Sequence, residues 1–402
     1  MRNNIYIYLA FLFLITIFPL KSYSQQQFNF EVTNVEILDD GNLFKGTNKG
    51  KIITDNGIEI HADSFEYNKA KNILNAQGNI KIEDKIQKYV IFTDSVTYFK
   101  NSEIIFTKSN SKAISNDGKT IIADDFKYEK KKNIINAIGK VKFEDKINKY
   151  NLFSDKITYF KNQEKIKTNG KTNIIIESKY KIDSKNILFL INERIISSEN
   201  KTTLRDDSFN VYKLDSFLYL LDKEQLKGNN IIAISNFDLP KSDKYYFKNG
   251  IIDLKNQNFV ASDVKVEFHK DIFDNPNNNP RLKGVSLNKS GNVTSLSKAV
   301  FTSCNENEKC PAWSLKAKKI KHDKSKKQMI YDNAVLKIYD VPVLYFPKFF
   351  HPDPSVKRQS GFLKPEINNS NILGSSLTIP YFYAKSHAKD FTFTPSIFDK
   401  NI

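Results

Sequence analysis

The sequence predicts an all-β protein made of stacked short strands, and three observations carry this prediction. Residues 62 to 101 align without a gap on residues 123 to 162, with 25 of 40 positions identical. Within this long repeat, the pattern Asp-x-apolar-x-Tyr returns about every 30 residues, with polar and apolar residues alternating. Tyr, Phe, Ile and Thr dominate, and no stretch sustains a helical period. Such a period predicts β units that each need neighbours to cover an apolar face.

The aromatic and aliphatic residues of the short motif are the candidates for the inside of the stack. The motif begins at Asp63, Asp94, Asp124 and Asp155, and its apolar positions share one parity and therefore one face. They either form an ordinary core or line an apolar groove. We expect the repeated aspartates to be hydrogen-bonding groups at turns or edges. The inward candidates are Phe65, Tyr67, Val96, Tyr98, Phe126, Tyr128, Ile157 and Tyr159.

Glycines and asparagines separate the strands that this pattern predicts. Turns need a positive φ or an Asx bend, which these two residue types supply. We therefore expect each unit to be a pair of short strands, with the stack growing along one axis. The residues concerned are Asn72, Gly78, Asn101, Gly118, Asn133 and Gly139.

Residues 1 to 24 have the pattern of a secretory signal peptide. Arg2 is followed by an apolar run from Ile5 to Phe18, too short for a typical bilayer span, and then by Ser22-Tyr23-Ser24. The mature chain is expected to begin near Gln25, outside the cytoplasm; an uncleaved anchor is the alternative. Because no later run has the length of a transmembrane helix, any membrane contact is expected to use strands.

Charge and cysteine content narrow the class of partner. The net charge is +17, but lysines are spread over the repeats and form no arginine-rich patch, which argues against nucleic acid. An anionic lipid or membrane surface is the expected partner if the charge is functional and not merely compositional.

Cys304 and Cys310 flank a short polar loop, so outside the cytoplasm they form either a local disulfide or two free thiols.

A proline-rich segment, residues 338 to 359, separates the stack (residues 25 to 337) from residues 360 to 402. Its prolines are incompatible with a helix or a central strand, so we expect a stiff, packed, extended connector. Beyond it, three strand-like stretches cover Gly361 to Ile367, Ser376 to Ala384 and Phe391 to Ile397. The four prolines of the connector are Pro342, Pro347, Pro352 and Pro354.

These residues resemble a known family. The runs VPVLYFP and FFHPDPSVKRQSGFLKP, preceded by Cys304, Cys310, Pro311 and Trp313, are similar to the LptD family of outer-membrane LPS-assembly proteins, most closely in its alphaproteobacterial form. The resemblance implies an OstA-like, V-shaped β-jellyroll over residues 25 to 337, whose interior holds the acyl chains of lipopolysaccharide. It also implies that residues 360 to 402 are the first strands of a transmembrane β-barrel, which three strands cannot close.

The resemblance further assigns a role to Pro365 and Pro380. In the family, prolines at matching places weaken strand pairing at a lateral gate through which lipopolysaccharide leaves the barrel; the alternative is simple strand-edge prolines. Its implied partners are lipopolysaccharide, a periplasmic bridge protein of the LptA type joined by β-strand addition, and a plug lipoprotein of the LptE type. The implied location is the outer membrane, with the N-terminal domain in the periplasm.

Enzymatic and cofactor chemistry finds little support in the sequence. The five histidines lack metal-site spacing, and no nucleophile, phosphate or dinucleotide motif occurs, so we expect no metal, no cofactor and no catalysis. A β-helix lyase or glycosidase is the enzyme alternative, but its catalytic residues would break the repeat. A soluble periplasmic bridge or scaffold without a barrel, or an adhesin-like β-stack, is the other alternative; it has no need of Pro365 and Pro380.

Overall fold

The computed structural model confirms the all-β class. It describes residues 28–235, 242–268, 279–304, 311–352, 356, 360–363, 365–370, 374–386 and 388–399, and these contain strands and short 3-10 turns but no α-helix. None of the described residues form a helix long and apolar enough to cross a membrane. The predicted signal peptide, Cys310 and Pro354 lie outside the described residues. The chain divides into two compact units, Met1–Asn116 and Asp117–Ile402.

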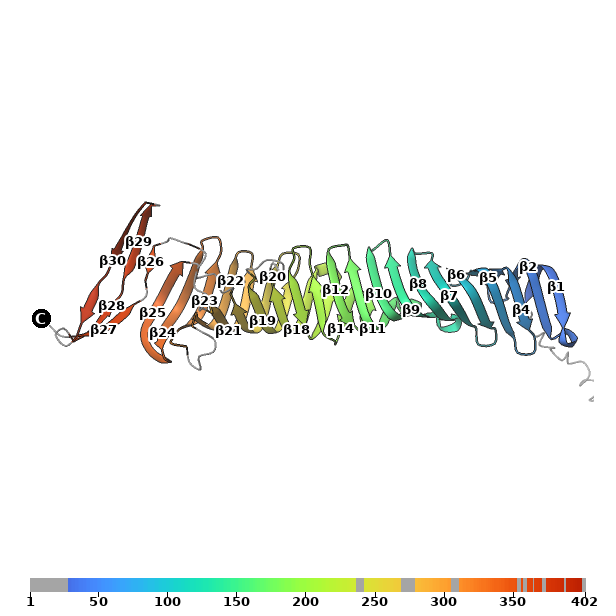
Figure 1. Cartoon of the computed structure of the whole chain (residues 1–402), viewed down its shortest axis with the longest axis horizontal. Helices are drawn as coiled ribbons and strands as arrows, with labels where there is room; N and C mark the ends of the chain where they lie inside the picture. Colours follow the sequence, from blue (N-terminus) through green and yellow to red (C-terminus); the bar gives the residue numbers. More distant parts are fainter. Residues whose placement is uncertain are drawn as a thin grey trace, which may run out of the picture. The chain divides into compact units, whose positions relative to one another are not determined.

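The first unit is a run of antiparallel strands that follow one another in chain order (Figure 1). A 3-10 turn, Asp39–Gly41, joins the first two. The strands are β1 (Asn29–Leu38), β2 (Leu43–Ile53), β3 (Ile58–Ala62), β4 (Ser64–Asn68), β5 (Ile73–Asp84), β6 (Tyr89–Phe99) and β7 (Ile104–Ser115).

The second unit continues the same pattern and ends in two small sheets (Figure 1). Its stack contains β8 (Lys119–Glu129), β9 (Ile134–Asp145), β10 (Tyr150–Phe160), β11 (Lys165–Ile176), β12 (Tyr180–Lys185), β13 (Leu188–Leu190), β14 (Ile195–Ser198), β15 (Thr202–Arg205), β16 (Val211–Leu214), β17 (Ser216–Leu220), β18 (Gln225–Ile234), β19 (Lys244–Asp253), β20 (Asn258–Glu267), β21 (Arg281–Ser290), β22 (Val293–Thr302), β23 (Trp313–Asp323), β24 (Gln328–Ile338) and β25 (Val341–Pro352). The small sheets contain β26 (Gly361–Phe362), β27 (Glu366–Ser370), β28 (Gly374–Thr378), β29 (Tyr381–Ser386), β30 (Lys389–Phe393) and β31 (Ser396–Phe398).

Each repeat strand is bent near its middle, and the motif aspartate lies at the bend. β5 pairs with β4 through its first half and with β3 through its second half. Asp63 lies between β3 and β4, and its carboxylate accepts a hydrogen bond from Asn79 Nδ2 at 2.7 Å. Asp94 and Asp215 accept equivalent bonds from Asn110 and Asn230. The aspartates are therefore hydrogen-bonding groups of the bend, as predicted.

The prediction of short strands separated at Gly78 and Gly139 is wrong. Both glycines lie inside long strands, β5 and β9, with φ of +79° and +81°. A Cβ at Gly139 would stand 2.8 Å from Asp124 Cγ, so only glycine leaves room for the aspartate. The positive φ turns the strand through the bend, which divides it into two halves. The halves on the two sides of the bend form two facing layers of one hydrogen-bonded array, and we call these layers the two sheets.

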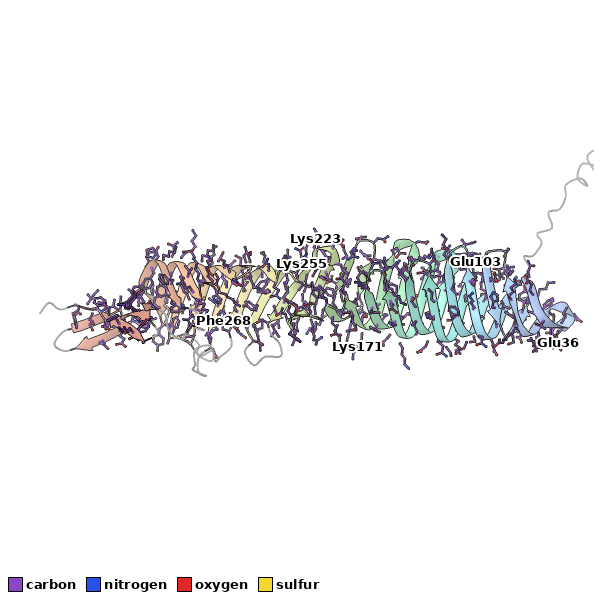
Figure 2. The ribbon with its side chains drawn as sticks, turned by 90° about the horizontal axis from the view of Figure 1, so that it is seen from above. Glu36, Glu103, Lys171, Lys223, Lys255 and Phe268 are labelled. Atoms are coloured by element: carbon purple, nitrogen blue, oxygen red, sulfur yellow. The ribbon has the colours of Figure 1, made fainter. Side chains whose placement is uncertain are left out.

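The strand ends form two rows of stacked turns, which we call lip A and lip B. In the second unit, lip A contains the turns at 130–133, 161–164, 191–194, 221–224 and 254–257, and lip B those at 146–149 and 177–179. Backbone bonds join successive turns of a lip, as from Lys161 N to Asn133 O at 3.2 Å and from Leu221 N to Arg194 O at 3.0 Å. In Figure 2, Lys223 and Lys255 of lip A lie along one edge of the stack, and Lys171, beside a bend, lies along the opposite edge.

The proline-rich segment was predicted to be an extended, packed connector; up to Pro352 it is extended, as predicted, but it forms a strand of the stack and not a packed connector. β25 pairs with β24 along its length, from Val341 opposite Ile338 to Pro352 opposite Gln328. Much of its apolar surface is exposed, including Val341 (60%), Tyr345 (59%) and Phe350 (47%). Among the described residues, β24 is the one strand that pairs with β25, so Pro342 and Pro347 fall where prolines are tolerated, on a strand paired along one edge.

Candidate functional site

All eight inward candidates are buried in the interior between the two sheets. Their exposed fractions are at most 4%, the highest being that of Phe65. The alternation of the repeat explains this, because one face of each strand half points to the opposite sheet. Burial places these side chains inside; whether lipid reaches them remains a prediction.

Side chains from the two sheets fill the interior of the second unit. Ring pairs join facing halves, with centroids 6.0 Å apart for Phe143 and Tyr159 and 5.9 Å apart for Tyr180 and Tyr219. Near Phe268, which Figure 2 labels, one space between these side chains measures about 10 Å³. That is room for about one water molecule. An acyl chain can enter such an interior only if the two sheets separate.

The first unit has an aromatic cluster at its N-terminal end. The ring of Phe28, just before β1, lies 4.6 Å from that of Tyr67 and 5.9 Å from that of Tyr98. The ammonium of Lys100 stands 4.7 Å above the same ring. Phe28 is only 5% exposed, so the start of the described chain occupies this end of the interior.

The tyrosine of the repeated motif spans from the interior to the mouth, the opening between lip A and lip B. Tyr67 donates to Asn72 Oδ1 at 2.8 Å, and Tyr159 donates to Glu164 Oε1 at 3.0 Å. Tyr98 accepts from Asn56 Nδ2 at 2.8 Å, and burial raises the pKa of its hydroxyl to about 12. The motif therefore places an aspartate at the bend, an apolar ring inside and a hydroxyl at the mouth.

Side chains of opposite charge meet across the mouth of the first unit. Lys100, in the lip A turn at 100–103, lies 3.7 Å from Asp55, in the lip B turn at 54–57. The Lys100 side chain is only 6% exposed, and burial lowers the pKa of its ammonium, partly offset by the Asp55 carboxylate. Strand ladders run between successive strands, so contacts from lip to lip are made by side chains such as these.

The second unit repeats this arrangement at successive levels. Lys119, the first residue of β8 on lip B, lies 3.0 Å from Glu164 of lip A and also pairs with Asp117. Lys179 of lip B lies 2.5 Å from Glu224 of lip A, which also accepts from the Tyr180 hydroxyl. Burial raises the pKa of Glu224, but the bonds from Lys179 and Tyr180 outweigh it and leave that pKa below its ordinary value.

One further contact across this mouth leaves a polar atom buried. The guanidinium of Arg194, on lip A, lies 5.8 Å from the ring centroid of Tyr150, the first residue of β10 at lip B. Tyr150 is 1% exposed, and its hydroxyl has no hydrogen-bond partner among the described residues. A buried donor of this kind is costly and is a point at which a bound group would gain a hydrogen bond.

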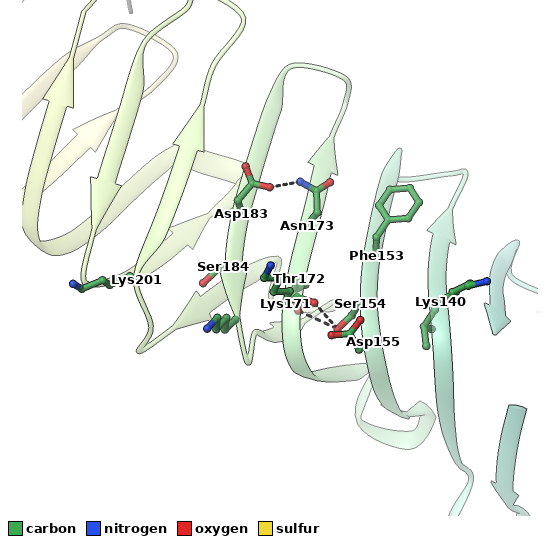
Figure 3. A pocket seen from close by; sticks show the side chains of 12 residues that line it. Lys140, Phe153, Ser154, Asp155, Lys171, Thr172, Asn173, Asp183, Ser184 and Lys201 are labelled. Carbon is green, nitrogen blue, oxygen red and sulfur yellow. Dashed lines mark hydrogen bonds between the residues drawn. The ribbon is translucent and has the colours of Figure 1, made fainter. Parts of the chain in front are cut away.

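A hollow of about 600 Å³ lies beside the bends of β10 to β12 (Figure 3). Of its lining residues, Asp183 accepts a hydrogen bond from Asn173 at 2.6 Å and another from Arg205, which lies outside the lining. Figure 3 also shows Ser154 bonded to Thr172, at 3.1 Å. Sequence reasoning missed this buried hydroxyl, although Ser154 and its counterpart Thr93 directly precede a motif aspartate.

At the C-terminal end, prolines break three neighbouring strands. β26 and β27 are separated at Pro365, β28 and β29 at Pro380, and β30 and β31 at Pro395. Leu363 N donates to Pro380 O at 2.8 Å, and Ile379 N donates to Pro395 O at 3.1 Å. Paired residues of this kind normally exchange two bonds, but a proline cannot return one. The prediction that Pro365 and Pro380 lie inside strands is wrong, because the strands stop at them.

Pro395 was missed by sequence reasoning, although the signal was available. It follows Pro380 by the same 15 residues that separate Pro380 from Pro365.

Cys304 is half-buried with its Sγ 3.6 Å from Trp313 O, and its predicted disulfide with Cys310 lies outside the described residues. No group of three or more potential metal ligands occurs within the described part of the chain.

The fold and site define a stack of bent strands with an apolar interior, a charged mouth and a terminal sheet broken by prolines. No protein-family model matches the chain. A stretch of 106 residues, 26% of this chain, is 38% identical to 13% of the LPS-assembly protein LptD of Polaromonas sp.. A stretch of 105 residues is 37% identical to LptD of Legionella pneumophila, covering 26% of this chain and 12% of that protein. The resemblance to the LPS-assembly protein LptD is thereby confirmed over about a quarter of the chain.

A third relative gives the same result. LptD of Shewanella denitrificans is 39% identical over 102 residues, 25% of this chain and 13% of that protein. The matched stretch is thus a small part of these longer relatives. Among solved structures, LptH of Pseudomonas aeruginosa, described as the LptA-homologous periplasmic component of a lipopolysaccharide transport device, matches with a TM-score of 0.26 and 17% identity. That match covers 29% of this chain and 84% of LptH.

Proposed function

We propose that this chain carries lipopolysaccharide to the outer membrane and takes part in its assembly there. The observation that carries this proposal is the apolar interior that the repeated motif forms in each unit, in a chain similar to LptD over a quarter of its length. The acyl chains of lipopolysaccharide would lie among these rings, where burial of apolar surface favours them. No covalent chemistry is needed, and the driving force would come from other components of the transport machinery.

The two ends of the described chain support the proposed route. β1 pairs with β2 on one side, and none of the other described strands pairs with its second edge. Val35 (53%) and Ile37 (58%) of β1 are exposed, as suits strand addition by a periplasmic bridge protein of the LptA type. At the other end, the prolines would weaken a barrel seam and form the lateral exit. A plug lipoprotein of the LptE type would occupy the barrel.

Site-specific photocrosslinking in cells tests the interior directly. A photoreactive residue at Phe65, Tyr98 or Phe126 is expected to yield lipopolysaccharide adducts, because these side chains are buried inside. The exposed neighbour Glu66 is the matched control and should yield none. Absence of adducts at all three sites, in a chain shown to be folded and exported, would mean that the interior is a dry core and the stack a scaffold.

A further inference from the structure

The closed mouth must open if the proposed function is correct. The interior is filled by rings from both sheets, so an acyl chain needs the lips to part. Several contacts from lip to lip join a cation to a carboxylate, and these are the charged groups nearest to an entering amphiphile's head. The side chains of the two pairs in the second unit keep exposures of 11% to 31%, so an anionic group arriving from the solvent can compete for the lysines.

We propose that the ion pairs across the mouth form a latch that an anionic amphiphile opens by exchange. Its head-group phosphate would take the place of Glu164 beside Lys119 and of Glu224 beside Lys179, while its acyl chains enter between the sheets. This inference rests on the proposed function and adds to it the residues that control entry and position the head group.

The geometry favours ion pairs that exchange partners with the head group over ion pairs that only hold the mouth closed. In the second unit, the cations Lys119 and Lys179 stand on lip B and their carboxylates on lip A, so each pair must break when the lips part. Charge-assisted bonds to a phosphate compensate for those that are lost. Tyr150 adds a buried hydroxyl donor at the same mouth, beneath Arg194. An anionic head group can therefore gain contacts at three successive levels without burying an uncompensated charge.

The first arm of the test removes the carboxylates from the full chain in cells, with a photoreactive residue at Phe126. Glu164→Gln together with Glu224→Gln should raise the yield of lipopolysaccharide adducts, by about threefold for each pair removed. The matched control is Glu144→Gln. Glu144 pairs with Lys142 on a single strand at 3.1 Å, and its side chain is as exposed (26%) as that of Glu224 (27%). The control should leave the yield unchanged.

The second arm removes the cations instead. Lys119→Gln together with Lys179→Gln breaks the same pairs and should increase hydrogen exchange at both lips as much as the carboxylate variants do. Adduct yield should nevertheless fall below that of the unaltered chain, because the groups that hold the phosphate are gone. Mass spectrometry of the adduct separates lipopolysaccharide from anionic phospholipid, and adducts with phospholipid alone would overturn the proposed ligand.

The remaining outcomes are separable. If cation and carboxylate variants both raise the yield, the pairs close the mouth but do not hold the head group, and the exchange is refuted. If neither differs from Glu144→Gln while the unaltered chain gives adducts, the latch is refuted and the proposed function stands. If the folded, exported, unaltered chain gives no adducts, the proposed function fails and the latch fails with it.

Discussion

The repeat stack and the C-terminal sheets contain similar alternating sequences but place their apolar residues oppositely. In the stack, Tyr98 and Tyr128 are fully buried, at 0% exposed. In the C-terminal sheets, Phe391 (60%), Phe393 (70%) and Ile397 (68%) are exposed. Alternation fixes which residues share a face, but it does not say what covers that face. The facing sheet covers the apolar side chains of the stack, whereas the apolar side chains of the described C-terminal strands named above are exposed.

The largest loss of stability is expected from a substitution in the buried face of the stack. Tyr98→Ala removes a fully buried ring, and core truncations of this size cost about 3–5 kcal/mol. Native-state hydrogen exchange of β5 to β7 in the full chain measures this loss. Phe393→Ala is the matched change on the exposed face and should alter stability by less than about 0.5 kcal/mol. Equal losses of stability at the two positions would contradict the conclusion that Tyr98 is buried and Phe393 is exposed.

Glycine substitutions at or near the bends of the repeat are expected to cause the next largest loss of stability. Gly139 and Gly118 share a φ of +81°, but a Cβ at Gly139 would meet Asp124, whereas one at Gly118 has its nearest neighbour 3.5 Å away. Gly139→Ala should therefore cost about 2–3 kcal/mol and Gly118→Ala about 1 kcal/mol, the part due to φ alone. Urea unfolding compares the two variants. An equal cost would show that the aspartate moves aside and that the bend does not depend on its position.

Sequence reasoning predicted the class of the fold and the buried face, since both follow from the period and parity of residues such as Tyr98 and Phe126. It did not predict the bends. Gly78 indicates a positive φ but not whether that φ ends a strand or turns it, which depends on Asp63 of the neighbouring strand. The contacts across the mouth were also missed, because Lys119 and Glu164 lie 45 residues apart and meet only once the strands are bent.

The prolines at the strand breaks allow a further test of this comparison in the C-terminal sheets. Pro395 accepts a bond from Ile379 but cannot return one, so Pro395→Ala should add the reciprocal bond to Ile379 O. A net gain of about 1 kcal/mol is expected for one such bond. Slow hydrogen exchange of the amide introduced at position 395, and slower exchange across β28 to β31, would show it. In the proposed transport function, the same change should slow lipopolysaccharide release. Unchanged exchange across these strands would mean that the break persists without the proline.

The smallest effect concerns the mouth of the stack and its dependence on pH. The Glu224 carboxylate has a pKa below its ordinary value of 4.5 in the folded chain, since the hydrogen bonds from Lys179 and Tyr180 outweigh the opposing effect of burial. A lowered folded pKa contributes stability that is complete above pH 4.5 and is lost as the pH falls through the folded value. The unaltered chain should therefore lose about 1 kcal/mol or less from this group on acidification.

Glu224→Gln removes that dependence. Its melting temperature should lie slightly below that of the unaltered chain at pH 7, and the two should converge as the pH falls below 4.5. Glu144→Gln, at the Lys142 pair within one strand, controls for loss of a carboxylate whose ion pair does not join the two lips. If only the melting curve of Glu224→Gln converges with that of the unaltered chain, the Lys179–Glu224 pair is formed in the folded protein. Parallel curves for all three proteins would mean that Glu224 and Lys179 do not interact in solution, and the closed mouth would then depend on ring packing alone.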